Sequence, residues 1–307
     1  MLIARIVIVA VASLLALVLV ACSADGDAPE AATTATVPAE MPTETSAPET
    51  PSSNAQGAID NRSLAEPARD TIFSCNASAL GEALDRPWVD GEGVIDLETK
   101  PVVEGEVTWE SELEIIVDAD ERSIMTNGLP DHETGDYPVE QDTEAFTYDP
   151  NPNGISAQDL VISVPADPVA AAEPSCLSLG PIGIALTGAV IFNALDAEVR
   201  DAVANELFDA CQGHPAAGGI YHYHHHSPCF DQGASDEHSP LVGYALDGFG
   251  IYGPHDEGGA LITNAELDEC HGHVGPALDS VVEVYHYHTT EAFPYTLGCY
   301  RGTPRGR

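Results

Sequence analysis

Alternating hydrophobic and polar residues predict β-strands over much of this chain. Residues 112–128, ELEIIVDADERSIMTNG, contain two such runs on either side of Asp118–Asp120, which is typical of two paired strands. Residues 183–193, GIALTGAVIFN, and 243–253, GYALDGFGIYG, each predict a further hairpin.

Turn residues stand at the centre of the second and third hairpins. Thr187-Gly188 and Asp247-Gly248 occupy these positions, and glycine supplies the positive φ angles that tight turns require. Asp247 could also be considered an acid catalyst, but turn formation is the favoured interpretation.

One segment has helical periodicity. Residues 196–211 place apolar side chains at Val199, Val203, Leu207 and Ala210, which predicts one helix. Together the patterns predict a mainly β fold, α+β at the margin. We expect antiparallel sheets in a sandwich-like arrangement, with one or two short helices and stabilising disulfides.

The N-terminus has the features of an export signal. Arg5 precedes an apolar stretch, 6–21, that is shorter than the roughly 20 residues a spanning helix needs. It ends in Leu-Val-Ala-Cys, which resembles a bacterial lipobox, so residues 1–22 are predicted to be a lipoprotein signal peptide with Cys22 lipidated. An ordinary signal peptide with an unmodified Cys22 is the alternative. The expected location is the outer face of a bacterial membrane.

Composition separates a tether from a folded domain. From residue 23 to 60 the chain has no aromatic residue, Lys or Arg, so it has too little apolar surface to offset chain entropy. We predict a disordered, acidic, Ala/Thr/Pro-rich tether over 23–70 and a single globular domain over 71–307.

Charge excludes some partners. The chain has 50 acidic and 10 basic residues, a formal net charge of -40, which repels phosphate backbones and anionic lipid surfaces. No nucleic-acid partner is therefore expected. Membrane contact is expected only through the lipid on Cys22.

Two segments repeat the same chemistry. Residues 207–224 and 267–288 each contain Asp-x-Cys-x-Gly-His followed by Tyr-His-Tyr-His, and a further cysteine follows each copy. Besides Cys22 the chain has six cysteines and no Cys-x-x-Cys pair, so in an exported protein three disulfides are expected. If the two copies are structurally equivalent, the simplest pairing is Cys211–Cys229, Cys270–Cys299 and Cys75–Cys176.

The histidines suggest a metal site. Eleven of the twelve lie between 214 and 288, and imidazole is the commonest metal ligand in proteins. On a strand His222 and His224 share one face, as do His286 and His288, while the tyrosines of each quartet face the core.

Two arrangements of these ligands are open. If the quartets pair as neighbouring strands, their four histidines form one shared site. Otherwise each repeat forms its own site with its Gly-His histidine, His214 or His273. A third reading is that the histidines only hydrogen-bond within a polar sheet.

Further residues are candidates for supporting roles. His225, His226 and His238 are auxiliary ligands or solvent-facing residues. Asp209 and Asp268 either orient the Gly-His imidazoles or form turns.

The sequence resembles the YHYH-domain family of exported proteins. The motifs run from about residue 125 to 302 and include NGLPDHETG with His132, NPNGISAQ, GIALTGAVIFN, DACQGHP, GIYHYHHHSPC, HSPLVGYALDGFGIYG, LDECHGH and YHYHTTEAFPYTLGCYRG. The resemblance implies a metal-binding role and no established reaction. It adds His132 as a candidate ligand.

Ligand chemistry favours a copper or zinc ion, copper slightly, because imidazole without thiolate suits both and tyrosine is close by. The predicted function is that of an extracytoplasmic lipoprotein that binds or delivers this metal. A metalloenzyme, either a copper oxidoreductase or a zinc hydrolase, is one alternative. A cell-surface structural module stabilised by metal and disulfides is another.

Overall fold

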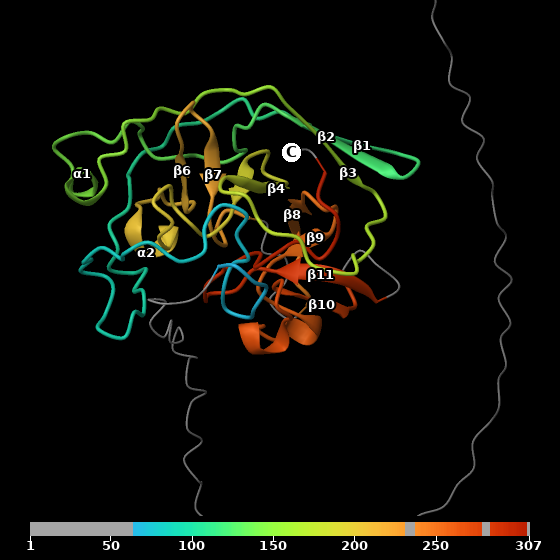
Figure 1. Cartoon of the computed structure of the whole chain (residues 1–307). Helices are drawn as coiled ribbons and strands as arrows, with labels where there is room; N and C mark the ends of the chain where they lie inside the picture. The colour runs from blue at the N-terminus through green and yellow to red at the C-terminus, as the bar shows by residue number, and fades with distance from the viewer. Residues whose placement is uncertain (1–63, 231–236, 278–282, 306–307) are drawn as a thin grey trace, which may run out of the picture. The chain divides into compact units, whose positions relative to one another are not determined.

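The computed structural model describes residues 64–230, 237–277 and 283–305 (Figure 1). The predicted signal peptide with Cys22, and the tether as far as residue 63, lie outside these ranges. Within them strands are the main regular structure, as the alternation predicted, with two short α-helices and long irregular segments. None of the helices in these ranges has both the length and the apolar character needed to span a bilayer.

Eight strands form one mixed sheet (Figure 1). Two of its strand pairs, β5 with β7 and β9 with β11, are parallel, and the others are antiparallel. In spatial order the strands are β10 (Gly272–Gly275), β11 (Val284–His288), β9 (Gly250–Tyr252), β8 (Leu241–Ala245), β4 (Pro181–Ala185), β5 (Val190–Phe192), β7 (Tyr221–Tyr223) and β6 (Gly213–Pro215).

The two halves of this sheet have the same connectivity. In each half a hairpin is followed by an antiparallel pair whose second strand returns beside the hairpin: β4-β5 precede β6-β7, and β8-β9 precede β10-β11. The halves meet where β4 and β8 pair, with Gly183 opposite Ala245, Ile184 opposite Tyr244 and Ala185 opposite Gly243. This register relates the halves by an approximate two-fold axis at the Ile184–Tyr244 pair. The sequence repeat therefore includes the hairpins as well as the histidine motifs.

The two Tyr-His-Tyr-His strands are not neighbours. β9, β8, β4 and β5 lie between β11 and β7, so of the two arrangements left open by the sequence, the one with paired quartets is not formed. Each quartet strand is instead paired on both edges with strands of its own repeat, β7 with β5 and β6, and β11 with β9 and β10. Such local pairings close shorter loops and lose less chain entropy.

All three predicted strand pairs are present. A second, three-stranded sheet contains β1 (Leu113–Asp118), β2 (Glu121–Thr126) and β3 (Leu160–Pro165). The turns of the other two hairpins contain Gly188 and Gly248, whose φ angles are 95° and 93°. These positive angles agree with turn formation at both glycines.

The three-stranded sheet packs against the larger one. Ile124 of β2 and Val164 of β3 are buried against Ile184 and Val190 of β4 and β5. This contact produces the predicted sandwich-like layering over the first half of the larger sheet.

The predicted helix over 196–211 is wrong. Only Ala202–Asn205 form a helix, α2, and the other α-helix, α1, is Glu144–Tyr148. Val199 has a left-handed φ of 63°, and the Asp196 carboxylate accepts backbone N–H bonds from Glu198 and Arg200. Because this local turn competes with a helix, Val199 and Leu207 reach the core from irregular backbone and only Val203 reaches it from α2, while Ala210 is exposed.

Three disulfides hold the irregular segments. They join Cys75 to Cys176, Cys211 to Cys229 and Cys270 to Cys299. This pairing agrees with the one expected from structurally equivalent repeats.

The disulfides should differ in their contribution to stability. Replacing Cys75 and Cys176 by alanine should reduce the free energy of unfolding by about 4–5 kcal/mol, and replacing Cys211 and Cys229 by about 3 kcal/mol, because a longer closed loop restricts the unfolded chain more. The sequence separations are 101 and 18 residues. Guanidinium denaturation measures both values. A larger loss for the shorter loop would contradict the entropic argument.

Candidate metal centres

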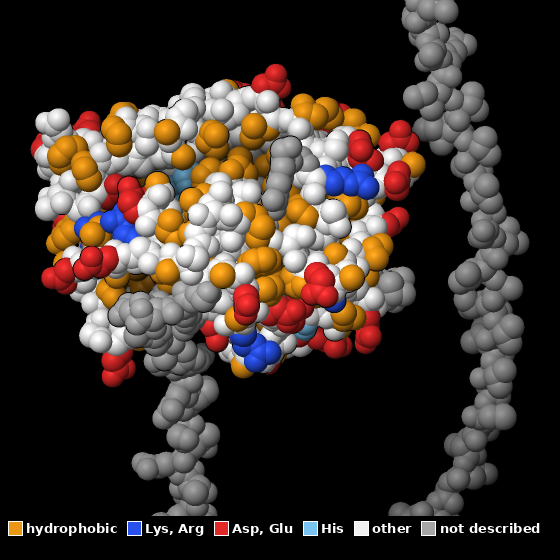
Figure 2. All heavy atoms as spheres, in the orientation of Figure 1, with side chains coloured by type: hydrophobic (Ala, Val, Ile, Leu, Met, Phe, Trp, Pro, Cys, Tyr) orange, Lys and Arg blue, Asp and Glu red, His pale blue; other side chains and the backbone are white. Residues whose placement is uncertain are grey.

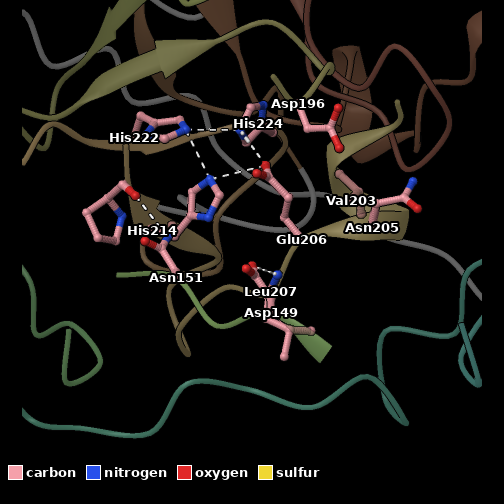
Figure 3. A network of polar contacts seen from close by, with 12 residues as sticks. Asp149, Asn151, Asp196, Val203, Asn205, Glu206, Leu207, His214, His222 and His224 are labelled. Carbon is pink, nitrogen blue, oxygen red and sulfur yellow. Dashed lines mark hydrogen bonds and ion pairs between the residues drawn. The ribbon is translucent and has the colours of Figure 1, made fainter. Parts of the chain in front are cut away.

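Three histidines of the first repeat converge on one point, and we call them cluster 1: His214, His222 and His224 (Figure 3). His214 lies on β6, His222 opposite it on β7, and His224 just after β7. The Nε2 atom of His222 is 3.1 Å from that of His214 and 3.0 Å from that of His224. All three side chains are buried.

Backbone carbonyls determine which nitrogen carries the proton. The Nδ1 atom of His222 is 3.1 Å from the carbonyl oxygen of Ile220, and that of His224 is 2.5 Å from the carbonyl oxygen of Asn193. A carbonyl only accepts, so we assign the proton to Nδ1 in both rings. The neutral rings then direct two Nε2 lone pairs toward each other across 3.0 Å. A cation bound between them removes this repulsion.

A carboxylate lies beside two histidines of cluster 1. Oε2 of Glu206 is 3.5 Å from the Nε2 atoms of both His214 and His224 (Figure 3). Burial, reinforced by the charges of Asp196 and Asp149, raises the pKa of Glu206 to about 8. Without a metal this carboxyl group is therefore protonated at neutral pH.

The second repeat builds a larger group, cluster 2, which contains His238, His273, His286 and His288. Its ligands form two overlapping sets, His238 with His286 and His288, and His273 with His288 and Asp256. Nε2 of His286 is at its centre, at 3.2 Å from that of His238, 3.1 Å from that of His273 and 3.0 Å from that of His288. Oδ1 of Asp256 is 4.0 Å from the Nε2 atoms of His238 and His273.

The same carbonyl arrangement orients cluster 2. Nδ1 of His286 is 3.0 Å from the carbonyl oxygen of Val284, two residues earlier, as in His222. Nδ1 of His288 is 2.6 Å from the carbonyl oxygen of Gly253, and Nδ1 of His238 is 2.7 Å from that of Ser239. Three rings therefore direct Nε2 lone pairs toward a common point.

Both clusters fit a transition-metal ion. Ligand nitrogens about 2.0–2.1 Å from one ion lie roughly 3.0–3.4 Å apart, depending on the angle between them. In each cluster the Nε2 atoms of contacting histidines are 3.0–3.2 Å apart. The described cysteines are all in disulfides, so neither cluster has a thiolate ligand.

Burial keeps the imidazoles neutral. It lowers the pKa of His224 to about 4, and it lowers the pKa of His214 and His222 well below 6.5, aided by the neighbouring imidazoles. In cluster 2 burial lowers the pKa of His286 to about 4. Neutral rings keep the lone pairs that a metal requires.

The tyrosines of the quartets occupy the opposite face, as predicted. Tyr221, Tyr223 and Tyr287 are fully buried in the core. The Tyr221 hydroxyl donates to Asp209 at 2.8 Å, and the Tyr285 hydroxyl donates to Asp268 at 3.1 Å.

The two repeat aspartates are turn residues. Each also accepts backbone N–H bonds within its own Cys-x-Gly-His turn. Among the described contacts neither touches a Gly-His imidazole, so Asp209 and Asp268 form turns and anchor tyrosines.

Asp247 also has a structural role. Its carboxylate is buried and accepts from the Tyr287 hydroxyl at 2.6 Å and from the backbone N–H of Gly302 at 2.9 Å. These contacts agree with its interpretation as a turn residue.

The predicted ligands fall into three groups. His214, His222 and His224 meet in cluster 1, and His273, His286 and His288 meet in cluster 2, as in the arrangement with one site per repeat. A single shared site for the two quartets is not formed. His132 joins neither cluster: its Nε2 atom contacts the Tyr223 hydroxyl at 2.5 Å, on the core side of β7.

Of the auxiliary candidates, only His238 belongs to a cluster. His225 contacts Oε1 of Gln212 at 3.1 Å, and His226 contacts Oγ1 of Thr289 at 3.0 Å. Sequence reasoning missed Glu206 and Asp256. Among 50 acidic residues, no spacing or motif distinguished these two.

Comparison with known proteins supports the family assignment. Residues 161–260 match the family model described as YHYH protein, so this segment is similar to that family. The match covers β4 to β9 and the first quartet, whereas His132 and the second quartet lie outside it. No match was found among curated proteins or among solved structures.

Titration of the metal-free protein tests the burial of the clusters. In NMR spectra the rings of His224 and His286 should become half-protonated near pH 4, whereas a free imidazole does so near about 6.5. The unfolded chain then binds more protons between these values, so both rings reduce stability as pH falls from about 6.5 to about 4.

Carboxyl groups with a raised pKa, such as Asp201 at about 6, act in the opposite sense. The NMR signals of the two rings, and not the pH dependence of stability, are therefore the measurement to use. Titration of both rings near pH 6.5 would show that the clusters are open to water.

Proposed function

We propose that this protein binds one transition-metal ion in each of its two histidine clusters, outside the cytoplasm, and that it stores or delivers this metal. The observation that carries the proposal is the orientation of the Nε2 lone pairs. In each cluster backbone carbonyls accept Nδ1–H bonds and direct unprotonated nitrogens toward one point.

The ligand sets favour copper or zinc. Imidazole is a good ligand for both ions, while the hard cations Ca²⁺ and Mg²⁺ prefer oxygen. Copper is slightly favoured, because cluster 2 offers four imidazoles. Cluster 1 offers three imidazoles and the Glu206 carboxylate, a set that also suits zinc.

Differences in burial support different roles for the two ions. The His214 and His224 side chains are 4% and 2% exposed. Such buried ligands are expected around an ion that stabilises the fold. In cluster 2 the His273 side chain is 19% exposed. An exchangeable or catalytic ion needs such access to solvent, so cluster 2 is the better candidate for metal delivery or for a metalloenzyme site.

The proposed location is the outer face of a bacterial membrane. The apolar N-terminal stretch and the lipobox-like Leu-Val-Ala-Cys support this proposal, together with three disulfides, which persist in oxidising compartments. Acidic side chains spread around the periphery of the domain in Figure 2, and such a surface favours cations near the clusters.

Metal analysis after reconstitution tests the two-site proposal. The wild type should bind two ions per chain. Changing His222 and His224 to alanine should remove one ion, and changing His286 and His288 to alanine should remove the other, because each pair supplies ligands to one cluster only. Mass spectrometry of the native protein counts the ions.

His226→Ala is the matched control, since His226 lies two residues after the first quartet but outside both clusters. It should keep two ions. Loss of all metal in either double variant would indicate one shared site. An unchanged count in both would leave the polar-sheet reading as the better account.

Lipid attachment tests the proposed location. A labelled lipid precursor should be incorporated into the wild type and not into Cys22→Ala, because lipidation uses that sulfur atom. Gel fluorography after labelling in a bacterial host measures this. Equal labelling of both proteins would contradict the proposed anchor.

A further inference from the structure

A cavity of about 570 Å³ lies beside cluster 2. His286 forms part of its wall, together with Tyr244, Tyr252, Tyr285 and Arg122. Its volume is in the range that small-molecule sites have in proteins, and aromatic walls with few polar groups are typical of such sites.

Among the described residues, none of the four main cavities has His214, His222 or His224 in its wall. In the two-fold relation Phe192 corresponds to Tyr252, and Val190 to Gly250. The Phe192 ring stacks on His222, with ring centroids 3.8 Å apart and planes inclined by 28°. The Tyr252 ring meets His286 edge-on, with centroids 5.1 Å apart.

Glycine at position 250 favours this arrangement. A Cβ atom there would lie 2.8 Å from Cε2 of Tyr252 and 2.9 Å from Cδ1 of Leu241. Gly250 stands at the position that Val190 occupies in the first half. Its lack of a side chain therefore leaves room for Tyr252 at the wall of the cavity.

Arg122 gives the cavity a positive charge. Its guanidinium lies 3.9 Å from the centroid of the Tyr244 ring and donates from Nη1 and Nη2 to the carbonyl oxygens of Pro165, Gly248 and Ala166. Among the described residues no carboxylate lies within 4.0 Å of it, although the chain has 50 acidic residues. Its hydrogen bonds to described residues leave Nε–H and one Nη2–H for another acceptor.

Carboxylate is the ligand group that best fits this wall. Guanidinium binds carboxylate through two parallel hydrogen bonds, while the tyrosine rings offer faces and edges to an aromatic ring. The one acidic side chain of the cavity, Asp167, is on an exposed segment, where water screens its charge.

We infer that this cavity binds a small aromatic carboxylate beside the metal of cluster 2. Arg122 holds the carboxylate and the tyrosines hold the ring. The position beside a metal rests on the proposed function, whereas the anion site itself rests on Arg122 and the cavity.

Titration calorimetry with benzoate tests this inference on the purified full-length protein, both zinc-loaded and metal-free. Benzoate should bind at one site, and benzyl alcohol, its uncharged counterpart, should not bind measurably. Arg122→Gln should weaken benzoate binding roughly ten-fold or more, since it removes a charge-assisted pair.

Two further variants make the result specific. Arg86→Gln is the matched control, because Arg86 also donates to a carbonyl and lies over an aromatic ring, that of Trp88, but does not line this cavity. It should leave benzoate affinity unchanged. Ala170→Trp, on the exposed rim, should obstruct the cavity and weaken binding even if Arg122→Gln fails to fold.

Metal content measured on the same samples separates this inference from the proposed function. Benzoate binding that depends on Arg122 in a protein that takes up no metal would support the cavity and overturn the function. A protein that takes up two ions but binds no benzoate, or binds it equally well in Arg122→Gln and Ala170→Trp, would overturn the cavity alone.

Discussion

The hydrogen bond from a histidine Nδ1–H to a backbone carbonyl is the interaction on which both clusters depend. It fixes the orientation and tautomer of both histidines of each quartet, so that their unprotonated Nε2 atoms face one another at 3.0 Å. Such an arrangement is unfavourable in an empty, buried site and favourable around a cation. The carbonyls of Asn193 and Gly253 occupy corresponding positions in the two repeats, so the same backbone geometry builds both sites.

Duplication explains the architecture as well as the chemistry. Each repeat forms half of the eight-stranded sheet, and the halves join through β4 and β8. Tyrosines on the core face anchor each quartet strand, for example through the contacts of Tyr221 with Asp209 and of Tyr285 with Asp268. The strands that carry the ligands are therefore held rigidly from behind, which preorganises the metal sites.

Small substitutions have made the two halves different. Phe192 covers His222, while Tyr252 and Gly250 leave His286 beside a cavity. The carboxylate near cluster 1 is Glu206, and the one near cluster 2 is Asp256, at a greater distance. Two sites of common design thus differ in ligand set and in access, which is the basis for assigning them different roles.

The sequence by itself determined the elements and the ligand types. Alternation and turn residues predicted the hairpins, and strand geometry placed the quartet histidines opposite the tyrosines, because these features depend on neighbouring residues. The disulfide pairing followed from the internal repeat, because equivalent copies place their cysteines equivalently. Only the tertiary structure decided that the quartets lie at opposite ends of the sheet, and that Glu206, His238 and Asp256 join the clusters. Strand order and long-range contacts reflect the packing of the whole chain, which no local pattern encodes. The same reason explains why residues 196–211, periodic enough for a helix, begin with a turn at Asp196 and contain only the short helix α2.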